Sequence, residues 1–196
     1  MLKLGLTGNI CAGKSIAETV FKKNGIPVID ADEIVHSLLA DDDAVIQQVK
    51  ELFYPNNLLD ENNKIDRKLL GQLVFKDEQK RKELEKILHP RVIALIEEFF
   101  ANNTDKPIAV ASLALLFEAE LTYLFDKTLL ITVENQTQID RLMTRNNYNK
   151  EQALSRINAQ LPQEEKIKKA DFVIKNNELI EKFEEKLNIF IKQQQN

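Results

Sequence analysis

The chain has 196 residues, of which 43% are hydrophobic and 30% are charged, a balance typical of a soluble globular protein. Its formal net charge of -4 at pH 7 argues against a nucleic-acid-binding protein that depends on bulk positive charge. No apolar run approaches the ~20 residues of a transmembrane helix, and a single cysteine, Cys11, excludes an internal disulfide. We therefore expect a cytoplasmic protein with no nucleic-acid or membrane partner.

Five short apolar segments, each bounded by turn or charged residues, are typical of strands in a parallel sheet. We expect these strands at residues 2–7, 27–32, 107–115, 127–133 and 171–174. Helical patterns lie between them, and an amphipathic pattern over about residues 178–191 predicts a final helix. The alternation predicts an α/β layered fold with right-handed crossovers.

A phosphate-binding motif directly follows the first expected strand. The sequence fits Gly-x-x-x-x-Gly-Lys-Ser over Gly8, Asn9, Ile10, Cys11, Ala12, Gly13, Lys14 and Ser15, and Ile16 opens an amphipathic helical pattern. In such a loop, backbone N–H groups surround a phosphate chain, the lysine reaches the terminal phosphates, and the serine hydroxyl coordinates Mg²⁺. The helix N-terminus adds partial positive charge. The chain is predicted to bind a nucleoside triphosphate.

Uneven spacing between the strands predicts two insertions in one domain. About 70 residues separate the second and third strands, more than one crossover helix requires. We expect a core at about 1–35, 105–135 and 170–196, a helical insertion at about 36–104, and a second excursion at about 136–168. Within the first insertion, residues 54–66 are rich in Asn, Asp and Pro and predict a loop.

Two carboxylates end the second expected strand. Asp30 and Asp32 would share one face of that strand, at the edge of the sheet where open α/β folds bind ligands. A carboxylate there can orient an acceptor hydroxyl, take its proton, or hold Mg²⁺ through water. The structural alternative is that one of the pair caps the following helix. We favour a functional role for Asp32.

Arginines are scarce, and three of the six lie in the second excursion. Arg141 and Arg145 are four residues apart and so share one face of a helix. Guanidinium groups on a segment that closes over ATP would stabilise the charge of the transferring phosphoryl group. The alternative is a solvated helix face.

Histidine is also rare. His89-Pro90 joins two helical patterns, 78–88 and 91–100, with the proline expected at the first position of the second helix. His36 has no partner at a metal-binding spacing, so we do not expect a zinc site.

Taken in order along nearly the whole chain, these motifs resemble the dephospho-coenzyme A kinase family. Besides the phosphate loop and residues 28–32, the resemblance rests on 64–70, 88–90, 115–118, 141–145, 156–162 and 170–176. It implies a three-layer αβα P-loop kinase fold with a five-stranded parallel sheet, a helical insertion that binds the coenzyme A portion, and a helical lid over residues 136–168.

The resemblance also implies roles for individual residues. Lys14 would hold the β- and γ-phosphates of ATP, and Ser15 would hold Mg²⁺. Asp32 would bind the acceptor 3′-hydroxyl, and His89 would help to shape the acceptor side. Arg141 and Arg145 would clamp the phosphates, and the turn near Asn176 would border the adenine. The implied enzyme phosphorylates dephospho-coenzyme A as a monomer or weak homo-oligomer.

Several loop residues depart from the family pattern. Asn9, Cys11, Ala12 and Ile16 stand where Gly, Gly, Ser and Thr are usual, and Ala114 replaces a proline. Asn9 tolerates left-handed dihedral angles, so the loop can still close. Cys11 is either an oxidation-sensitive thiolate at a helix N-terminus or a small buried filler.

Two other functions remain open from the sequence. One is a different P-loop small-molecule kinase, with a nucleoside or sugar-acid acceptor. The other is a nucleotide-binding regulator with little turnover. Lys14 and Asp32 are both present, which favours an enzyme.

Overall fold

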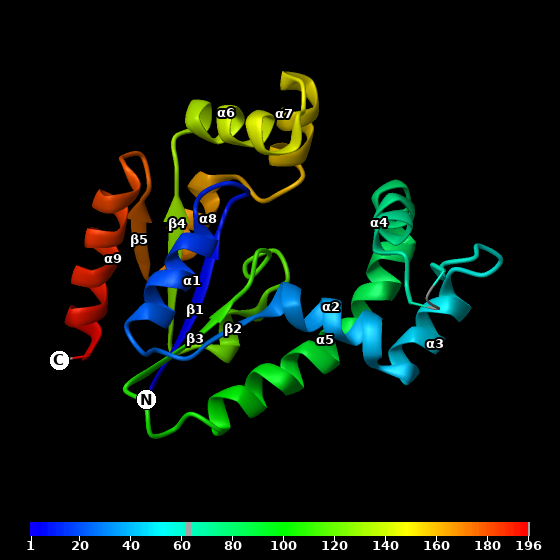
Figure 1. Cartoon of the computed structure of the whole chain (residues 1–196), viewed down its shortest axis with the longest axis horizontal. Coiled ribbons are helices and arrows are strands. Elements are labelled where there is room, and N and C mark those ends of the chain that lie inside the picture. Colours follow the sequence, from blue (N-terminus) through cyan, green and yellow to red (C-terminus); the bar gives the residue numbers. More distant parts are fainter. Residues whose placement is uncertain (62–63, 196) are drawn as a thin grey trace. The chain divides into compact units, whose positions relative to one another are not determined.

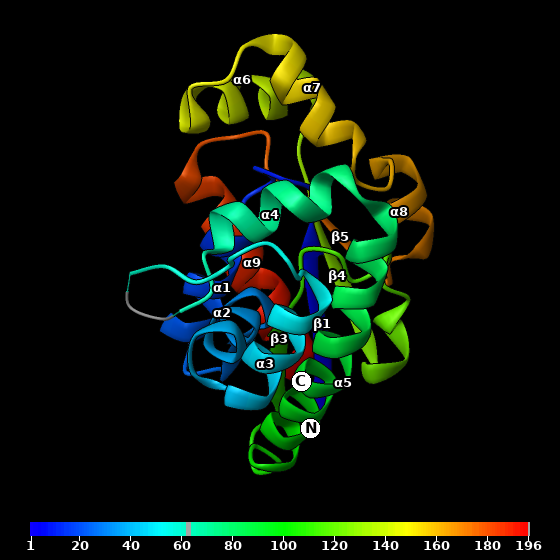
Figure 2. The same ribbon diagram turned by 90° about the vertical axis from the view of Figure 1, so that its right-hand side faces the viewer.

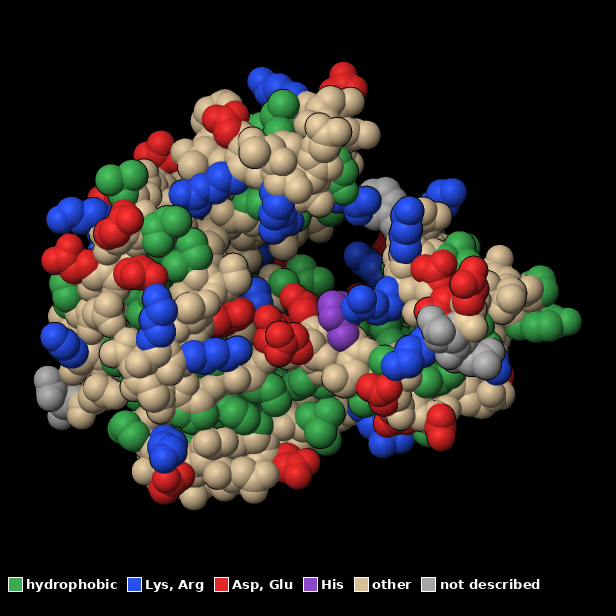
Figure 3. Space-filling model, viewed as in Figure 1, with side chains coloured by type: hydrophobic (Ala, Val, Ile, Leu, Met, Phe, Trp, Pro, Cys, Tyr) green, Lys and Arg blue, Asp and Glu red, His purple; other side chains and the backbone are tan. Residues whose placement is uncertain are grey.

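The computed structural model describes residues 1–61 and 64–195. The chain forms two compact units, Met1–Asp30 with Phe100–Asn196 and Ala31–Phe99, which we call the sheet unit and the helical unit (Figure 1). Among the described residues, no helix is both long and apolar enough to span a membrane. On the face shown in Figure 3, basic and acidic side chains are interspersed.

The sheet unit is built on one parallel sheet with the strand order β2-β3-β1-β4-β5. The strands are β1 (Leu2–Gly8), β2 (Val28–Asp30), β3 (Ile108–Ser112), β4 (Lys127–Thr132) and β5 (Phe172–Lys175). Strand β1 is central: Leu4 pairs with Val110 of β3 and Leu6 with Leu129 of β4. The predicted five-stranded parallel sheet is confirmed, and its central strand leads directly into the phosphate loop.

Helices α1 (Lys14–Lys23) and α9 (Ile180–Gln195) cover one face of this sheet (Figure 1). Alternate side chains of the strands point toward them because successive strand residues face opposite sides. The main core therefore consists of strand and helix residues, namely Leu4, Leu6, Ile108, Val110, Leu129, Ile131, Ala17, Val20, Phe21, Phe183, Leu187 and Ile191. This packing fixes α1, whose N-terminus carries the loop lysine.

Three helices fill the second excursion, as predicted. They are α6 (Asn135–Asn146), α7 (Lys150–Asn158) and α8 (Gln163–Lys169), and we call them the lid helices. Helix α7 begins with a capping box in which Asn149 and Gln152 each bond to the other's backbone N–H. Ile139, Leu142 and Ala153 form a small buried cluster between α6 and α7. The two helices thus pack as one body.

The helical unit contains α2 (Ala31–Asp41), α3 (Asp43–Leu52), α4 (Arg67–Lys76) and most of α5 (Glu78–Ala101) (Figure 2). Asp42 and Asp66 cap α3 and α4 through their side chains. The described part of the predicted loop at 54–66 lies between α3 and α4, so that prediction is confirmed outside residues 62 and 63.

The predicted break at His89-Pro90 is wrong, because α5 continues through it. A proline inside a helix removes one N–H donor and crowds the carbonyl four residues earlier. However, Leu84, Leu88, Val92 and Ile96 form a buried stripe at four-residue spacing on both sides of Pro90. Burial of this stripe outweighs the local cost of the proline.

The second strand is shorter than predicted, and this changes the place of Asp32. Strand β2 ends at Asp30, and α2 begins at the next residue. Asp30 and Asp32 therefore do not share a strand face. Asp32 and Glu33 lie in the first turn of α2, where the helix dipole stabilises negative charge. The third strand is also shorter than expected and ends at Ser112.

Asp171 joins the start of β5 to the start of β4. Its carboxylate accepts hydrogen bonds from Lys127 Nζ, Thr128 N and Thr128 Oγ1, each at 2.9 Å. Burial raises the pKa of Asp171, but these hydrogen bonds outweigh it and hold the pKa below its usual value. The carboxylate thus stabilises the fold above the unfolded pKa of ~3.9, and this contribution is lost as the pH falls through the lower folded value.

We expect Asp171→Asn to lower the free energy of unfolding by about 1 kcal/mol at pH 7, because three hydrogen bonds weaken together. The difference from wild type should begin to shrink below about pH 4, where Asp171 of the unfolded chain takes up a proton, and should be lost as the pH falls through the lower pKa of the folded state. Urea unfolding followed by circular dichroism at pH 3, 4, 5 and 7 measures this. Asp105→Asn is the matched control, because Asp105 forms an exposed ion pair with Lys106. Equal losses in both variants would contradict the assignment.

Candidate active site

The phosphate loop follows β1 and ends where α1 begins, at Lys14. Gly13, the residue before α1, has a φ of 107°, which is in the left-handed region. A Cβ atom at this position would overlap the side-chain amide of Asn176. Glycine is therefore required here both for the backbone angle and for the close approach of Asn176.

Asn176 holds the loop from the end of β5. Its side chain is buried, and Nδ2 donates to the carbonyl of Ala12 at 2.8 Å. Its backbone N–H donates to Thr132 at the end of β4, also at 2.8 Å. The loop is thus tied to the carboxyl ends of two neighbouring strands. The residue expected to border the adenine also fixes the loop itself.

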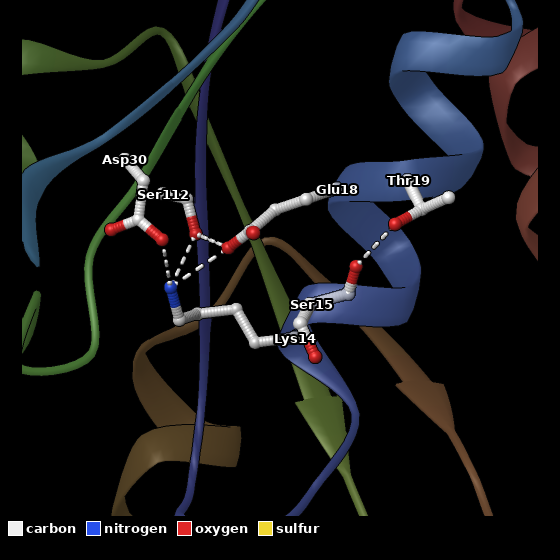
Figure 4. Close-up of polar contacts among 6 residues, drawn as sticks. All are labelled: Lys14, Ser15, Glu18, Thr19, Asp30 and Ser112. Atoms are coloured by element: carbon white, nitrogen blue, oxygen red, sulfur yellow. Dashed lines mark hydrogen bonds and ion pairs between the residues drawn. The ribbon is translucent and has the colours of Figure 1, made fainter. Parts of the chain in front are cut away.

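The Lys14 ammonium lies among three acceptors from three different elements (Figure 4). Its Nζ is 2.8 Å from Glu18 Oε1 on α1, 2.8 Å from Ser112 Oγ at the end of β3, and 3.3 Å from Asp30 Oδ2 at the end of β2. Ser112 Oγ also donates to Glu18 Oε1 at 2.5 Å. The side chains of Lys14, Glu18 and Asp30 are each at most 16% exposed.

Two of these acceptors, Glu18 and Asp30, are carboxylates that form ion pairs with the Lys14 ammonium. A bound phosphate chain would compete with Glu18 and Asp30 for Lys14, because ion pairs in a partly buried setting are only weakly screened. The lysine is already positioned at the carboxyl edge of the sheet, and binding requires a change of partner.

Both predicted arginines lie near enough to the loop for their charges to act on Cys11, and Arg141 also hydrogen-bonds to the loop. Arg141 on α6 donates to the carbonyls of Cys11 at 3.4 Å and Asn176 at 3.3 Å. Arg145 is exposed, and its Nε donates to Asn146 at 2.9 Å. Arg141 therefore already touches the phosphate loop, whereas the clamping role of Arg145 stays a prediction.

Cys11 has a φ of 61°, so a residue with a Cβ takes a left-handed conformation. Burial raises the pKa of the Cys11 thiol, and the positive charges of Arg145 and Arg141 offset this only in part. The thiol is then protonated at neutral pH, which argues against the reactive thiolate considered from the sequence. Cys11 packs with Ile10 and Met143 against the small α6–α7 cluster, as the filler alternative predicts.

Ser15 is exposed in the first turn of α1, and its carbonyl accepts a hydrogen bond from Thr19 Oγ1 at 2.9 Å. Ile16 follows with a partly buried side chain. The described residues contain no group of three His, Cys, Asp or Glu side chains that could hold a metal. The Ser15 hydroxyl is a hard oxygen of the kind that Mg²⁺ prefers, so the residues present fit such an ion together with phosphate oxygens and water.

The remaining predicted residues belong to the helical unit. Asp32 is exposed in the first turn of α2, and His89 is half-buried in α5. Their roles toward the acceptor stay predictions.

Glu18 and Ser112, which both contact Lys14, were not among the site residues predicted from the sequence. Glu18 could have been found, because a residue four positions after Lys14 on the same helix lies beside it. Ser112 carries no motif of its own. Its place becomes evident only from the strand order, which puts the end of β3 between β1 and β2.

A glycine-rich loop that joins the central strand of a parallel sheet to a helix, with lysine at the helix start, is the phosphate-binding device of P-loop proteins. Together with the lid helices and the inserted helical unit, it places this chain among the P-loop kinases. The family model described as dephospho-CoA kinase matches residues 2–182, and the chain belongs to that family.

Individual relatives agree with this assignment. The chain is 40% identical over 184 residues to a dephospho-CoA kinase of Oceanobacillus iheyensis, an alignment that covers 92% of this chain and 91% of the relative. It is 37% identical over 192 residues to one of Listeria monocytogenes, covering 96% of this chain and 94% of the relative.

Among solved structures, a protein of Thermus thermophilus is 31% identical, with a TM-score of 0.83 and coverage of 98% of this chain and 97% of the other. Dephospho-CoA kinase from Campylobacter jejuni is 29% identical, with a TM-score of 0.67 and coverage of 98% and 96%. A shikimate kinase of Bacteroides thetaiotaomicron, 16% identical with a TM-score of 0.51, shares the fold.

We expect Cys11→Gly to raise the free energy of unfolding by about 0.5–1 kcal/mol. Glycine relieves the left-handed strain of about 1–2 kcal/mol, and the more flexible unfolded chain cancels part of the gain. Cys11→Ala, the matched control, keeps the Cβ and should stay within about 0.5 kcal/mol of wild type. Urea unfolding midpoints measure both. A gain that is the same in both variants would trace the effect to the thiol and not to the backbone.

Proposed function

We propose that this chain transfers the γ-phosphoryl group of ATP to the ribose 3′-hydroxyl of dephospho-coenzyme A, which yields coenzyme A. The observation that carries the proposal is the loop lysine, Lys14, present at the head of α1 in a chain that belongs to the dephospho-CoA kinase family. Phosphoryl transfer needs positioning and charge stabilisation more than covalent chemistry. The site offers both.

In this proposal, each part of the loop acts on the phosphate chain. The N-terminus of α1, with its partial positive charge and backbone donors, would face the phosphates. Lys14 leaves Glu18 and Asp30 and pairs with the β- and γ-phosphates. Arg141, already hydrogen-bonded to the loop, adds positive charge there, with Arg145 on the same helix. Ser15 would hold Mg²⁺, and the ion would supply positive charge against the charge that develops on the phosphates.

The acceptor is assigned to the helical unit. Asp32 would orient the 3′-hydroxyl and take its proton, and His89 would shape the acceptor side. The proposed enzyme works in the cytoplasm, since a chain with a single cysteine fits a reducing compartment, and it acts as a monomer or weak homo-oligomer.

The test is ADP release from ATP and Mg²⁺ with and without dephospho-coenzyme A. Adenosine, shikimate and gluconate serve as control acceptors. We expect release to depend on dephospho-coenzyme A, with coenzyme A as the product. Release with a control acceptor alone would favour another small-molecule kinase. ATP binding without release for any acceptor would favour a nucleotide-binding regulator.

Two substitutions separate the proposed roles. Lys14→Ala should lower kcat/KM at least ~100-fold, because it removes a preorganised charge from the phosphates. Asp32→Asn should depress kcat far more than it weakens ATP binding. Glu33→Gln, which changes the neighbouring carboxylate in the same helical turn, is the control for Asp32. Steady-state kinetics and ATP titration measure these effects, with circular dichroism to verify folding. Equal loss of kcat and ATP affinity in Asp32→Asn would indicate a structural role.

A further inference from the structure

A buried ion pair lies outside the residues discussed so far. Lys166 on α8 is 0% exposed, and its Nζ is 2.7 Å from Oε1 of Glu118, which follows β3 and is 20% exposed. Lysine is almost never fully buried in a protein unless it is paired. An ammonium in this position therefore needs a physical explanation.

Stability does not explain the pair. Its geometry meets the distance of an ion pair but not the angles of a hydrogen bond, and within the described part of the chain Glu118 Oε2 has no hydrogen-bond partner. Burial removes the hydration of both charges, and an incompletely hydrogen-bonded pair regains only part of that loss. Apolar side chains of similar size could fill this space at a lower cost.

Gln160 and Leu161, which lie between α7 and α8, connect the pair to the phosphate loop. Glu118 Oε1 accepts a hydrogen bond from the backbone N–H of Leu161 at 3.1 Å. The carbonyl of Leu161 accepts from Asn9 Nδ2 at 3.4 Å, and Gln160 Oε1 accepts from the N–H of Ile10 at 2.8 Å. Residues 160 and 161 thus touch the pair on one side and the loop on the other.

Polar contacts hold this segment beside a cavity. A cavity of about 510 Å³ lies beside it, lined by residues of the loop and the lid that include Asn9, Gln138, Gln160 and Leu161. Across the cavity, Gln138 Nε2 donates to the carbonyl of Ile10 at 2.9 Å. The backbone N–H and the backbone carbonyl of Ile10 are therefore each hydrogen-bonded to a glutamine side chain, Gln160 and Gln138 respectively.

The orientation of these peptide groups matters, because a phosphate site works only when its donors are held close to the productive geometry. We propose that Lys166 and Glu118 are positioning residues that hold the phosphate loop in its ATP-binding form through Gln160 and Leu161. The proposal rests on the proposed function insofar as the loop binds ATP. It assigns the pair no contact with substrate.

A set of three variants tests this role. Lys166→Met leaves a partly buried carboxylate without its cation and should lower the melting temperature by about 10 °C. Glu118→Gln leaves the ammonium unpaired and should have a similar effect. The double variant removes both buried charges together, so its melting temperature should return close to that of wild type. Lys169→Met, at an exposed position of the same helix, is the control.

ATP affinity distinguishes positioning from a merely structural role. We expect the double variant to regain stability but to bind ATP about tenfold more weakly, because an amide without Lys166 no longer fixes the Leu161 peptide. Titration calorimetry with ATP and Mg²⁺, without acceptor, measures this. Gln160→Ala should weaken ATP binding to a similar degree, and adding it to the double variant should cause little further loss.

The outcomes are separable. ATP affinity that recovers together with the melting temperature in the double variant would overturn the proposal. Wild-type ATP affinity in Gln160→Ala would also overturn the proposal. This second test does not depend on how well the variants of Lys166 and Glu118 fold. Absence of acceptor-dependent ADP release would contradict the proposed function and leave these affinity measurements as a valid test.

Discussion

Between the end of β1 and the start of α1, the chain must reverse direction and still direct its N–H groups at a ligand. Residues 9–13 achieve this with two left-handed positions, Cys11 and Gly13. Such angles are unfavourable for a residue with a Cβ, so surrounding contacts must hold them. Asn176 supplies one such contact from β5. The strand order therefore determines the form of the loop. It places β4 and β5 on one side of β1, so that Asn176 after β5 can bond to the loop.

The same strand order sets the charge around Lys14. The ends of β2 and β3 bring Asp30 and Ser112 to the ammonium, and α1 adds Glu18. These acceptors keep a long, flexible side chain ordered before nucleotide arrives, which lowers the entropy that binding must remove. They also compete with phosphate for the lysine. Affinity for ATP would then reflect a difference between two sets of contacts.

Much of the fold and part of the site could be predicted from the sequence, because local patterns encode them. Apolar runs gave the five strands, and the glycine spacing gave the phosphate loop. The continuity of α5 through Pro90 could not be predicted, since it depends on the buried stripe along the whole helix. The helical position of Asp32 was missed because β2 ends after three residues. Ser112 carries no local signal. Glu118 belongs to the motif at 115–118, but only the tertiary arrangement shows that it pairs with Lys166.

The loop of this chain contains fewer glycines than the family pattern. Its backbone is held in part by hydrogen bonds with side chains that lie outside the loop. Glycine lets a backbone follow an unusual path but does not hold it there. Here Asn9 reaches Leu161, and Gln138 and Gln160 fix the two polar groups of Ile10. Because all three partners belong to the lid helices or to the segment that joins them, loop conformation and lid position are coupled. A change in the position of these helices would break the contacts to Asn9 and Ile10 and so alter the form of the loop.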